Sequence, residues 1–166
     1  RYGDNLKTFY VGNTNIMKEE EKRKLLKNYN PDFLPIDLVK SIYEENEGLD
    51  PLAKMSDVDI QVWLEGDIYL NVDKMSKAAG LEVRMPLTDL RVFDIASRMP
   101  SKFKVNSEDE HNKLALRKAA LNVLPEEIAY RKKLGFVVPI RMWMADERYN
   151  GDVKRLFDSP IAEKFF

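Results

Sequence analysis

Residues 66–89 read GDIYLNVDKMSKAAGLEVRMPLTD, and the spacing of the apolar residues changes once along this stretch. In its first part, and just before it, apolar side chains recur every three or four positions, at Ile60, Leu64, Ile68, Val72, Met75 and Ala79. This is the period of an α-helix, so we predict a long helix, or two helices broken near Gly66, with this face in the core. From Leu81 to Leu87 apolar residues alternate with charged ones, which predicts a short extended segment ended by Pro86.

The neighbouring segments are also helical in pattern. Ser56, with Asp59 three residues later, is typical of a helix N-terminus, so the long helix is expected to begin there. Further helices are predicted over residues 18–27, 36–46, 89–98 and 107–123, and from Pro125 to about residue 131. The chain has 166 residues, the length of one ordinary domain. The sequence therefore predicts a mainly α fold arranged as a single domain over residues 1–166.

The charge balance and the residue types exclude several classes of protein. The chain holds 27 Lys and Arg against 28 Asp and Glu, a net charge of −1, whereas a nucleic-acid binder needs a clustered cationic excess. It has no cysteine, which excludes disulfides, thiolate zinc sites and a cysteine nucleophile, and its one histidine, His111, leaves no paired-histidine metal motif. No uncharged run approaches the length of a membrane span. We therefore expect a cytoplasmic protein with no nucleic-acid or membrane partner and no metal bound through its own side chains.

The densest basic segment runs from Tyr130 to Phe136 and contains Lys133 and Gly135. Cations followed by a glycine are typical of a helix C-terminus, and by spacing alone this interpretation is favoured. The other interpretation is a lysine that a loop delivers to an anionic oxygen, as in phosphoryl and adenylyl transfer. A glycine would let the backbone of such a loop approach a ligand closely.

Three acidic residues near predicted apolar surfaces are further candidates. Asp67 and Asp73 could bind a metal or accept a proton, but solvated ion pairs one helical turn apart, as between Asp73 and Lys77, explain such residues more simply. Glu82 and Arg84 lie in the extended segment opposite a fully apolar face. If that segment is buried on both sides, the two charged groups need partners, and structural and functional roles both stay open.

Further blocks follow residues 66–89 in a fixed order, namely KLALR at 113–117, LPEEI at 124–128 and RKKLGFVVP at 131–139. Taken together, the four blocks resemble the C-terminal synthetase domain of glutamine-hydrolysing asparagine synthetases. The corresponding patterns in that family are K-x-x-L-R, L-P-x-x-I and R-x-K-x-G-F-x-V-P, after a region that ends in L-E-x-R-x-P. The resemblance covers about half of the chain, and it is specific because order and spacing agree throughout.

The resemblance implies an ATP-dependent ligase. In this family ATP and Mg²⁺ activate aspartate as β-aspartyl-AMP, and ammonia released from glutamine by an N-terminal glutaminase domain attacks the adenylate. The family's ATP site is built around a Ser-Gly-Gly-x-Asp-Ser loop, which this chain does not contain. The resemblance therefore implies the helical C-terminal section of an α/β adenine-nucleotide α-hydrolase-like (ATP pyrophosphatase) domain. Its partners would be the remainder of that domain and the glutaminase domain, and alone it would be inactive and bind neither ATP nor Mg²⁺.

Residue by residue, Lys133 matches the lysine of R-x-K-x-G-F and would be the catalytic group that faces the adenylate and the departing diphosphate. Gly135 would keep the loop close to the ligand, and Asp73 would lie on the nucleotide and diphosphate side. Glu82 and Arg84 would lie on the substrate side or hold it in shape. Related enzymes amidate or cyclise other carboxylates, so the acceptor stays open.

A second interpretation is a non-catalytic helical interaction module derived from the same family. Amphipathic helices and a basic loop also suit a protein partner. The two interpretations differ in whether the chain works together with a nucleotide site.

Overall fold

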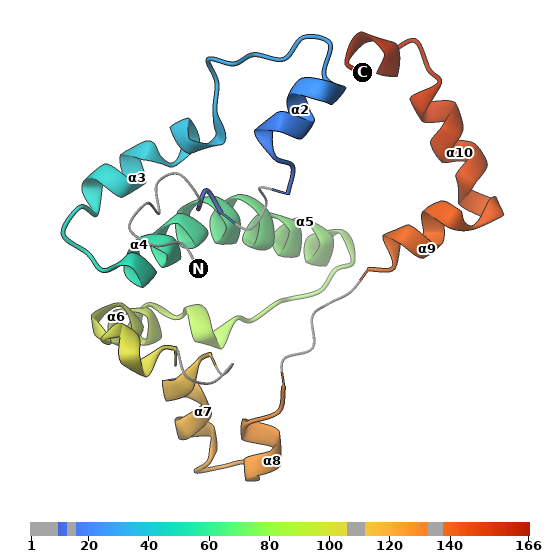
Figure 1. Ribbon diagram of the computed structural model, residues 1–166. Coiled ribbons are helices and arrows are strands. Elements are labelled where there is room, and N and C mark those ends of the chain that lie inside the picture. Colours follow the sequence, from blue (N-terminus) through green and yellow to red (C-terminus); the bar gives the residue numbers. More distant parts are fainter. Residues whose placement is uncertain (1–9, 13–15, 106–111, 133–137) are drawn as a thin grey trace. The chain divides into compact units, whose positions relative to one another are not determined.

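The computed structural model describes residues 10–12, 16–105, 112–132 and 138–166, and every regular element within these ranges is a helix (Figure 1). The elements are α2 (Glu19–Leu25), η1 (Pro35–Leu38), α3 (Lys40–Glu45), α4 (Pro51–Val58), η2 (Asp59–Tyr69), α5 (Leu70–Ala78), η3 (Pro86–Thr88), α6 (Leu90–Arg98), η4 (Ser101–Phe103), α7 (Leu114–Ala120), α8 (Glu126–Ala129), α9 (Ile140–Ala145), α10 (Glu147–Phe157) and η5 (Ala162–Lys164). The prediction of a mainly α chain is confirmed. None of the helices in the described ranges combines the length and apolar character that a bilayer crossing requires.

The chain divides into two compact units. The first unit comprises residues 1–15 and 34–132, and the second comprises residues 16–33 and 133–166. That both units belong to one domain stays a prediction.

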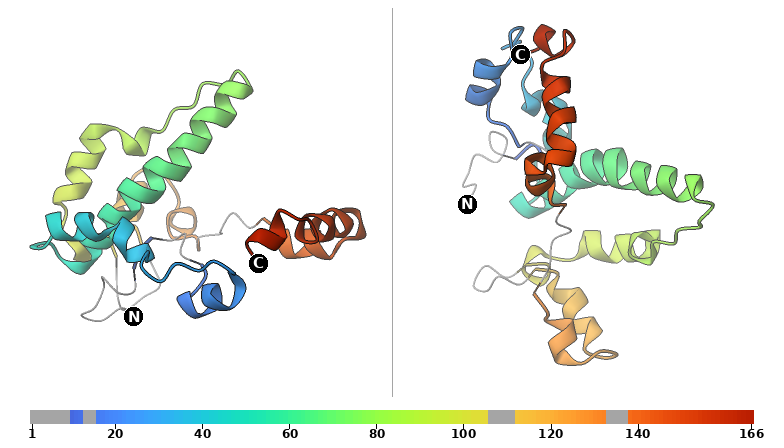
Figure 2. Two further views of the ribbon diagram at one scale, coloured as in Figure 1. Left: turned by 90° about the horizontal axis from the view of Figure 1, so that it is seen from above. Right: turned by 90° about the vertical axis from the view of Figure 1, so that its right-hand side faces the viewer.

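The longest element of the first unit is continuous from α4 through η2 to α5 (Figure 2). Its middle part, η2, is π-helical, and the helix does not break at Gly66. The helix begins at Pro51 rather than at Ser56, because the Asp50 carboxylate accepts hydrogen bonds from the N–H groups of Leu52 and Ala53, at 3.0 and 3.2 Å. An Asp N-cap followed by proline is a strong helix start, so the prediction based on Ser56 was wrong.

The core of the first unit lies at one end of this helix. Its buried side chains are Tyr10, Val39, Ile42, Tyr43 and Val58. The helix face predicted to be core is half-buried at Ile60 and Leu64, but Met75 is 69% exposed. The prediction therefore fails at Met75, whereas Val72 is half-buried and lines a hollow that it shares with the segment after the helix.

Local signals set the geometry after the long helix. Gly80 has a φ of 66°, and the Leu81 N–H donates to the Ser76 carbonyl at 2.8 Å, which closes the helix end. Residues 81–85 are extended, as predicted. Asp89 then caps α6 by accepting a hydrogen bond from the Arg91 N–H at 2.9 Å.

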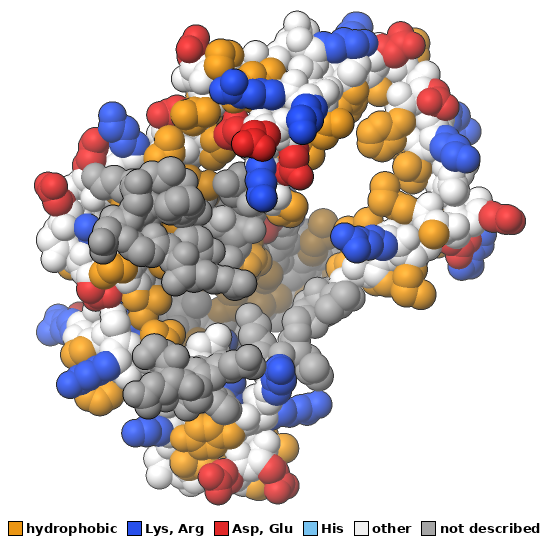
Figure 3. Space-filling model, in the orientation of Figure 1, with side chains coloured by type: hydrophobic (Ala, Val, Ile, Leu, Met, Phe, Trp, Pro, Cys, Tyr) orange, Lys and Arg blue, Asp and Glu red, His pale blue; other side chains and the backbone are white. Residues whose placement is uncertain are grey.

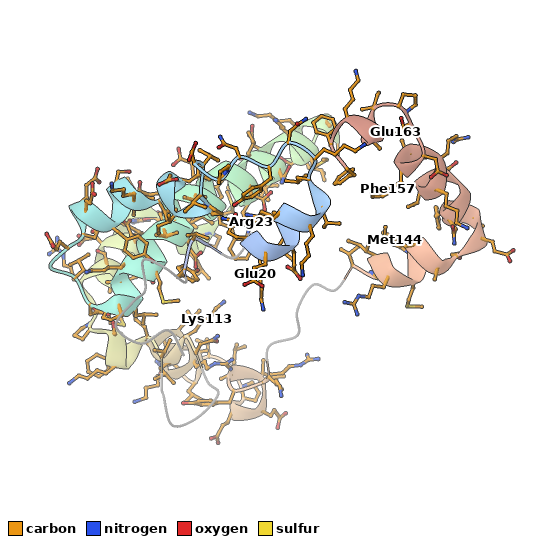
Figure 4. The ribbon with its side chains drawn as sticks, turned by 45° about the horizontal axis from the view of Figure 1, so that its top comes forward. Glu20, Arg23, Lys113, Met144, Phe157 and Glu163 are labelled. Carbon is orange, nitrogen blue, oxygen red and sulfur yellow. The ribbon has the colours of Figure 1, made fainter. Side chains whose placement is uncertain are left out.

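Helices α7 and α8 follow side by side in the first unit (Figures 1 and 2). Lys113, labelled in Figure 4, precedes α7 with a φ of 60°. Of the helix predicted over 107–123, the structure shows α7 from Leu114 to Ala120, and the left-handed Lys113 cannot itself be part of a continuous helix. The predicted cap at Ser107 lies outside the described residues.

In the second unit, α2 confirms the helix predicted over 18–27. The Lys27 N–H donates to the Phe165 carbonyl at 2.9 Å, and the Lys27 ammonium donates to the Glu163 carbonyl at 2.6 Å. The ring centroids of Phe166 and of Phe157, which is labelled in Figure 4, lie 5.9 Å apart. Apolar side chains along α9 and α10 reach the surface (Figure 3).

Candidate functional site

A hollow of about 490 Å³ lies between α5 and the extended segment that follows it. Its lining includes Asp73, Ser76 and Lys77 from the helix, and Leu81, Glu82 and Met85 from the segment. The tight turn at Gly80 brings the two walls together. Two of the predicted site residues, Asp73 and Glu82, therefore face one space although nine positions separate them.

The Asp73 carboxylate pairs with the Lys77 ammonium one helical turn away, at 2.8 Å. Both side chains are more than half exposed. The pair is the solvated ion pair that the spacing predicted, and such pairs stabilise a helix by only about 0.3–0.5 kcal/mol. Since water reaches both groups, a ligand in the hollow could compete for either charge.

Glu82 and Arg84 form an ion pair with one another along the extended segment. Their side chains are 74% and 84% exposed, so the side of the segment that carries these charges is open to solvent. The alternation of apolar and charged residues suggested a strand with a packed face, but no strand among the described residues pairs with this segment. The two charges need no other partner, because water solvates both.

Asp67 is held by its own helix rather than by a lysine. Its two carboxylate oxygens accept hydrogen bonds from the Trp63 ring N–H at 3.0 Å and the Asn71 amide at 2.5 Å. Within the described ranges, no three acidic or histidine side chains come together as a metal site. No Mg²⁺ site is therefore assigned to these residues.

Arg117 forms a site that the sequence analysis missed. From α7 its guanidinium Nε donates to the Asn112 carbonyl at 2.9 Å. Its Nη1 donates to the Ala129 carbonyl at 2.8 Å and to the Arg131 carbonyl at 3.1 Å. Side-chain bonds to a distant backbone leave no periodic signal, and the K-x-x-L-R block was the only hint of this arginine.

Asp50 forms a second polar link within the first unit. Besides capping α4, its carboxylate accepts a hydrogen bond from the Ser101 hydroxyl at 2.8 Å. This hydrogen bond, together with those from the N–H groups of Ala53 and Leu52, lowers the pKa of Asp50. The link joins the start of the long helix to η4, across 51 positions of sequence.

Comparison with known proteins assigns the chain to a family. The family model described as asparagine synthase matches residues 1–165. The chain belongs to the asparagine synthase family. The match extends the resemblance of residues 66–139 to nearly the whole chain, so both units fall within one family match.

Individual relatives of this chain support the same family assignment, because they are named as asparagine synthetases. "Asparagine synthetase [glutamine-hydrolyzing] 1" of Bacillus subtilis is 44% identical over 138 residues, which are 83% of this chain and 22% of the relative. A Mycobacterium tuberculosis relative is 38% identical over 135 residues, 81% of this chain and 20% of the relative. The chain thus spans about a fifth of the length of the curated relatives it matches. No solved structure matches it.

For this member of the asparagine synthase family, the structure places part of the predicted site. Asp73 and Glu82 line one hollow, and Arg84 pairs with Glu82 beside it. Lys133 and Gly135 lie outside the described residues, so their predicted roles stay predictions. The described residue that precedes Lys133 is Lys132, and Arg117 binds the carbonyls of Ala129 and Arg131 shortly before it.

Proposed function

We propose that this chain is part of an ATP-dependent, glutamine-hydrolysing asparagine synthetase. The family match over residues 1–165, together with the 44% identical Bacillus relative named for that activity, carries the proposal. In it, aspartate is activated as β-aspartyl-AMP and ammonia from glutamine then attacks the adenylate. Because the chain spans about a fifth of its relatives, the nucleotide loop and the glutaminase domain would be supplied by other parts of a longer protein.

The proposed fold context is an α/β ATP pyrophosphatase domain of which residues 1–166 form the helical C-terminal section. Several helices of the chain have apolar faces exposed to solvent, as expected of elements that pack on a further layer. ATP and Mg²⁺ would be the cofactors of the whole synthetase. The chain itself would contribute side chains to the edge of the active site.

Lys133 is the proposed catalytic residue. When the aspartate carboxylate attacks the α-phosphorus, negative charge develops on the phosphorus oxygens and then on the leaving diphosphate. A fixed ammonium stabilises both without exchanging a proton. Gly135, two positions later, would let the loop backbone lie close to these oxygens.

The hollow beside α5 would lie on the ligand-facing side. The ion pair of Asp73 with Lys77 and that of Glu82 with Arg84 leave this surface with balanced charge. A balanced surface does not attract a multiply charged anion by itself. We therefore propose that these residues shape the site and do not bind phosphate themselves. In this proposal Asp73 lies on the diphosphate side, and Glu82 and Arg84 lie on the substrate side.

The proposal is tested in a chimera. The matched segment of the Bacillus subtilis relative is replaced by that of this chain, and asparagine formation is measured with aspartate, ATP and either glutamine or ammonia. The expected result is synthesis from both nitrogen sources. Lys133→Ala should lower the synthesis rate at least 100-fold, the usual effect of removing one group that stabilises developing charge, while glutaminase activity persists.

The matched control is Lys118→Ala, which removes an exposed lysine of α7 and should leave synthesis unchanged. Normal synthesis by the Lys133→Ala chimera would remove Lys133 from the mechanism. A chimera with full glutaminase activity and no synthesis would instead favour a non-catalytic interaction module.

A further inference from the structure

Another hollow, of about 280 Å³, lies along η2 in the first unit. Its lining is formed by Asp59, Ile60, Trp63, Leu64 and Ile68. All of these residues belong to η2, so within the described part of the chain this hollow has a single helical wall. A small molecule in a pocket is enclosed over most of its surface, so one helix face suits a packing element better than a small ligand.

The wall of this hollow is an apolar helix face. Ile60, Leu64 and Ile68 recur every four positions, a spacing that keeps side chains on one side of a helix. Trp63 beside them is half-buried, and its ring N–H donates to the Asp67 carboxylate at 3.0 Å, which fixes the indole. A fixed aromatic ring among aliphatic side chains is typical of the centre of a protein interface.

Asp59 adds a carboxylate to this apolar face. One of its oxygens, Oδ1, is buried and accepts no hydrogen bond from the described part of the chain. The Tyr43 phenol, whose pKa is raised by burial and by the Asp59 charge, donates to the Tyr10 carbonyl and not to Asp59. A carboxylate that has lost part of its hydration needs a donor or a cation, and Asp59 lines the hollow, where a partner can approach it.

We propose that the η2 face, residues 59–68, is the docking surface for a segment of the longer protein outside residues 1–166. The segment brings apolar side chains to Leu64 and Ile68 and one arginine or lysine to Asp59. The inference rests on the proposed function, in which this chain makes up about a fifth of a synthetase. The cation compensates the Asp59 charge, and the apolar side chains remove the face from water.

The charges of η2 favour this occupant over a second copy of the chain. The helix contains Asp59, Glu65 and Asp67 but no lysine or arginine. In a twofold dimer the same face of each copy meets the other, so a second η2 face would bring further carboxylates to Asp59 and no cation.

The first experiment identifies what covers the η2 face. In the chimera, Leu64 is replaced by the photo-crosslinking amino acid benzoylphenylalanine, and the cross-linked peptides are identified by mass spectrometry after irradiation. The expected product is a cross-link within one chain to a peptide outside the grafted segment that carries an arginine or lysine. Ile68, which is 38% exposed, is the second position, so the test stands if the variant at Leu64 does not fold.

The matched control places the same amino acid at Glu65, an exposed residue of η2 that does not line the hollow. It should give no cross-link to that peptide. Cross-links from Leu64 and Ile68 that reach only the grafted segment, or only a second copy of the chimera, would overturn the proposal. The absence of any cross-link at both positions would do the same, since the face would then be open to water.

The second experiment tests the charge of Asp59. Urea is added before irradiation, and the urea concentration at which half of the cross-link is lost is recorded. Asp59→Asn, which keeps the size of the side chain, should lower this midpoint by about 0.5–1 M, whereas Glu65→Gln should leave it unchanged. Replacing the arginine or lysine of the cross-linked peptide by glutamine should lower the midpoint equally, and the double variant should lower it no further. Additive effects of the two single variants would overturn the ion pair.

The outcomes separate this inference from the proposed function, because no catalytic activity is measured. If the chimera makes no asparagine but gives the expected cross-link, the proposed function fails and the docking surface stands. If the chimera makes asparagine and the η2 face gives no such cross-link, the docking surface is wrong and the proposed function stands.

Discussion

Tyr43 shows at the scale of a single residue how the core holds a polar group. Its side chain is 1% exposed, and its hydroxyl donates to the Tyr10 carbonyl at 2.9 Å. Burial, together with the nearby negative charge of Asp59, raises the pKa of the Tyr43 phenol above its ordinary value of 10.0. The neutral hydroxyl of Tyr43 thus links α3 to Tyr10, which lies 33 positions earlier in the sequence.

Tyr43→Phe should lower the free energy of unfolding of the first unit by about 1–2 kcal/mol at pH 7, because it removes the buried hydrogen bond from the phenol to the Tyr10 carbonyl. Urea unfolding followed by Trp63 fluorescence, in a Trp143→Phe background, measures this change for the first unit. Above pH 10 the unfolded phenol ionises before the folded one, so the wild type should lose stability there as pH rises and Tyr43→Phe should lose less. Tyr149→Phe, at an exposed tyrosine, is the control, and an equal effect of both variants would contradict the prediction.

At the scale of elements, Asp50 links the start of the long helix with η4. The same carboxylate caps α4 and accepts the Ser101 hydroxyl bond. Its pKa is lowered from 3.8, so its ionised form is favoured in the folded chain. The contribution is present above pH 3.8 and is lost as pH falls through the lower pKa of the folded state.

Asp50→Ala should cost about 1 kcal/mol at pH 7, a typical value for the loss of an N-cap. The difference from the wild type should shrink as pH falls below 3.8, since the wild-type carboxyl is then increasingly protonated. Thermal unfolding by circular dichroism from pH 7 to pH 3 measures both effects. Asp94→Ala removes an exposed carboxylate in the same unit as a control, and an equal loss in that variant would argue against a specific role of the cap.

For the whole molecule, the balance of buried and exposed apolar side chains is unusual. Among the described residues, six apolar side chains are buried, and Tyr43, Val39 and Val58 are the largest fully buried ones. Large apolar residues on α6, by contrast, are open to solvent, with Leu90 82% and Ile95 65% exposed. Clusters of this kind usually mark surfaces that another chain segment or protein covers.

We therefore expect the isolated 166-residue chain to self-associate, with a sedimentation coefficient that rises with concentration over about 5–100 μM because apolar surface is removed from water on association. The double variant Leu90→Glu with Ile95→Glu should shift this rise to higher concentration. Ser97→Glu adds a charge to the same helix at a polar position and should have a smaller effect. If the chain sediments as one species at all concentrations, the exposed side chains of Leu90 and Ile95 do not drive self-association.

Much of the architecture followed from local patterns. The helices α2, α6 and α8 and the extended residues 81–85 agree with prediction, because periodicity acts over a few residues. The blocks of sequence also indicated the asparagine synthase family, which the family match confirmed. That Asp73 and Glu82 line the same hollow could also have been predicted from sequence, since only the turn at Gly80 lies between the helix and the segment that carry them.

Other features depended on contacts between distant residues, which no local pattern encodes. The core formed around Tyr10, Val39 and Tyr43 rather than along the predicted helix face, because burial requires a second element over that face. The long helix began at Pro51 with Asp50 as its N-cap, and the bonds of Arg117 to Ala129 and Arg131 appeared only once α7 and α8 lay side by side. Sequence by itself indicated most of the helices up to residue 129, although not α9 and α10, and it indicated the family, since those properties are local or cumulative. The tertiary structure decided which side chains are buried and which carbonyls are held, because both depend on chain segments meeting in space.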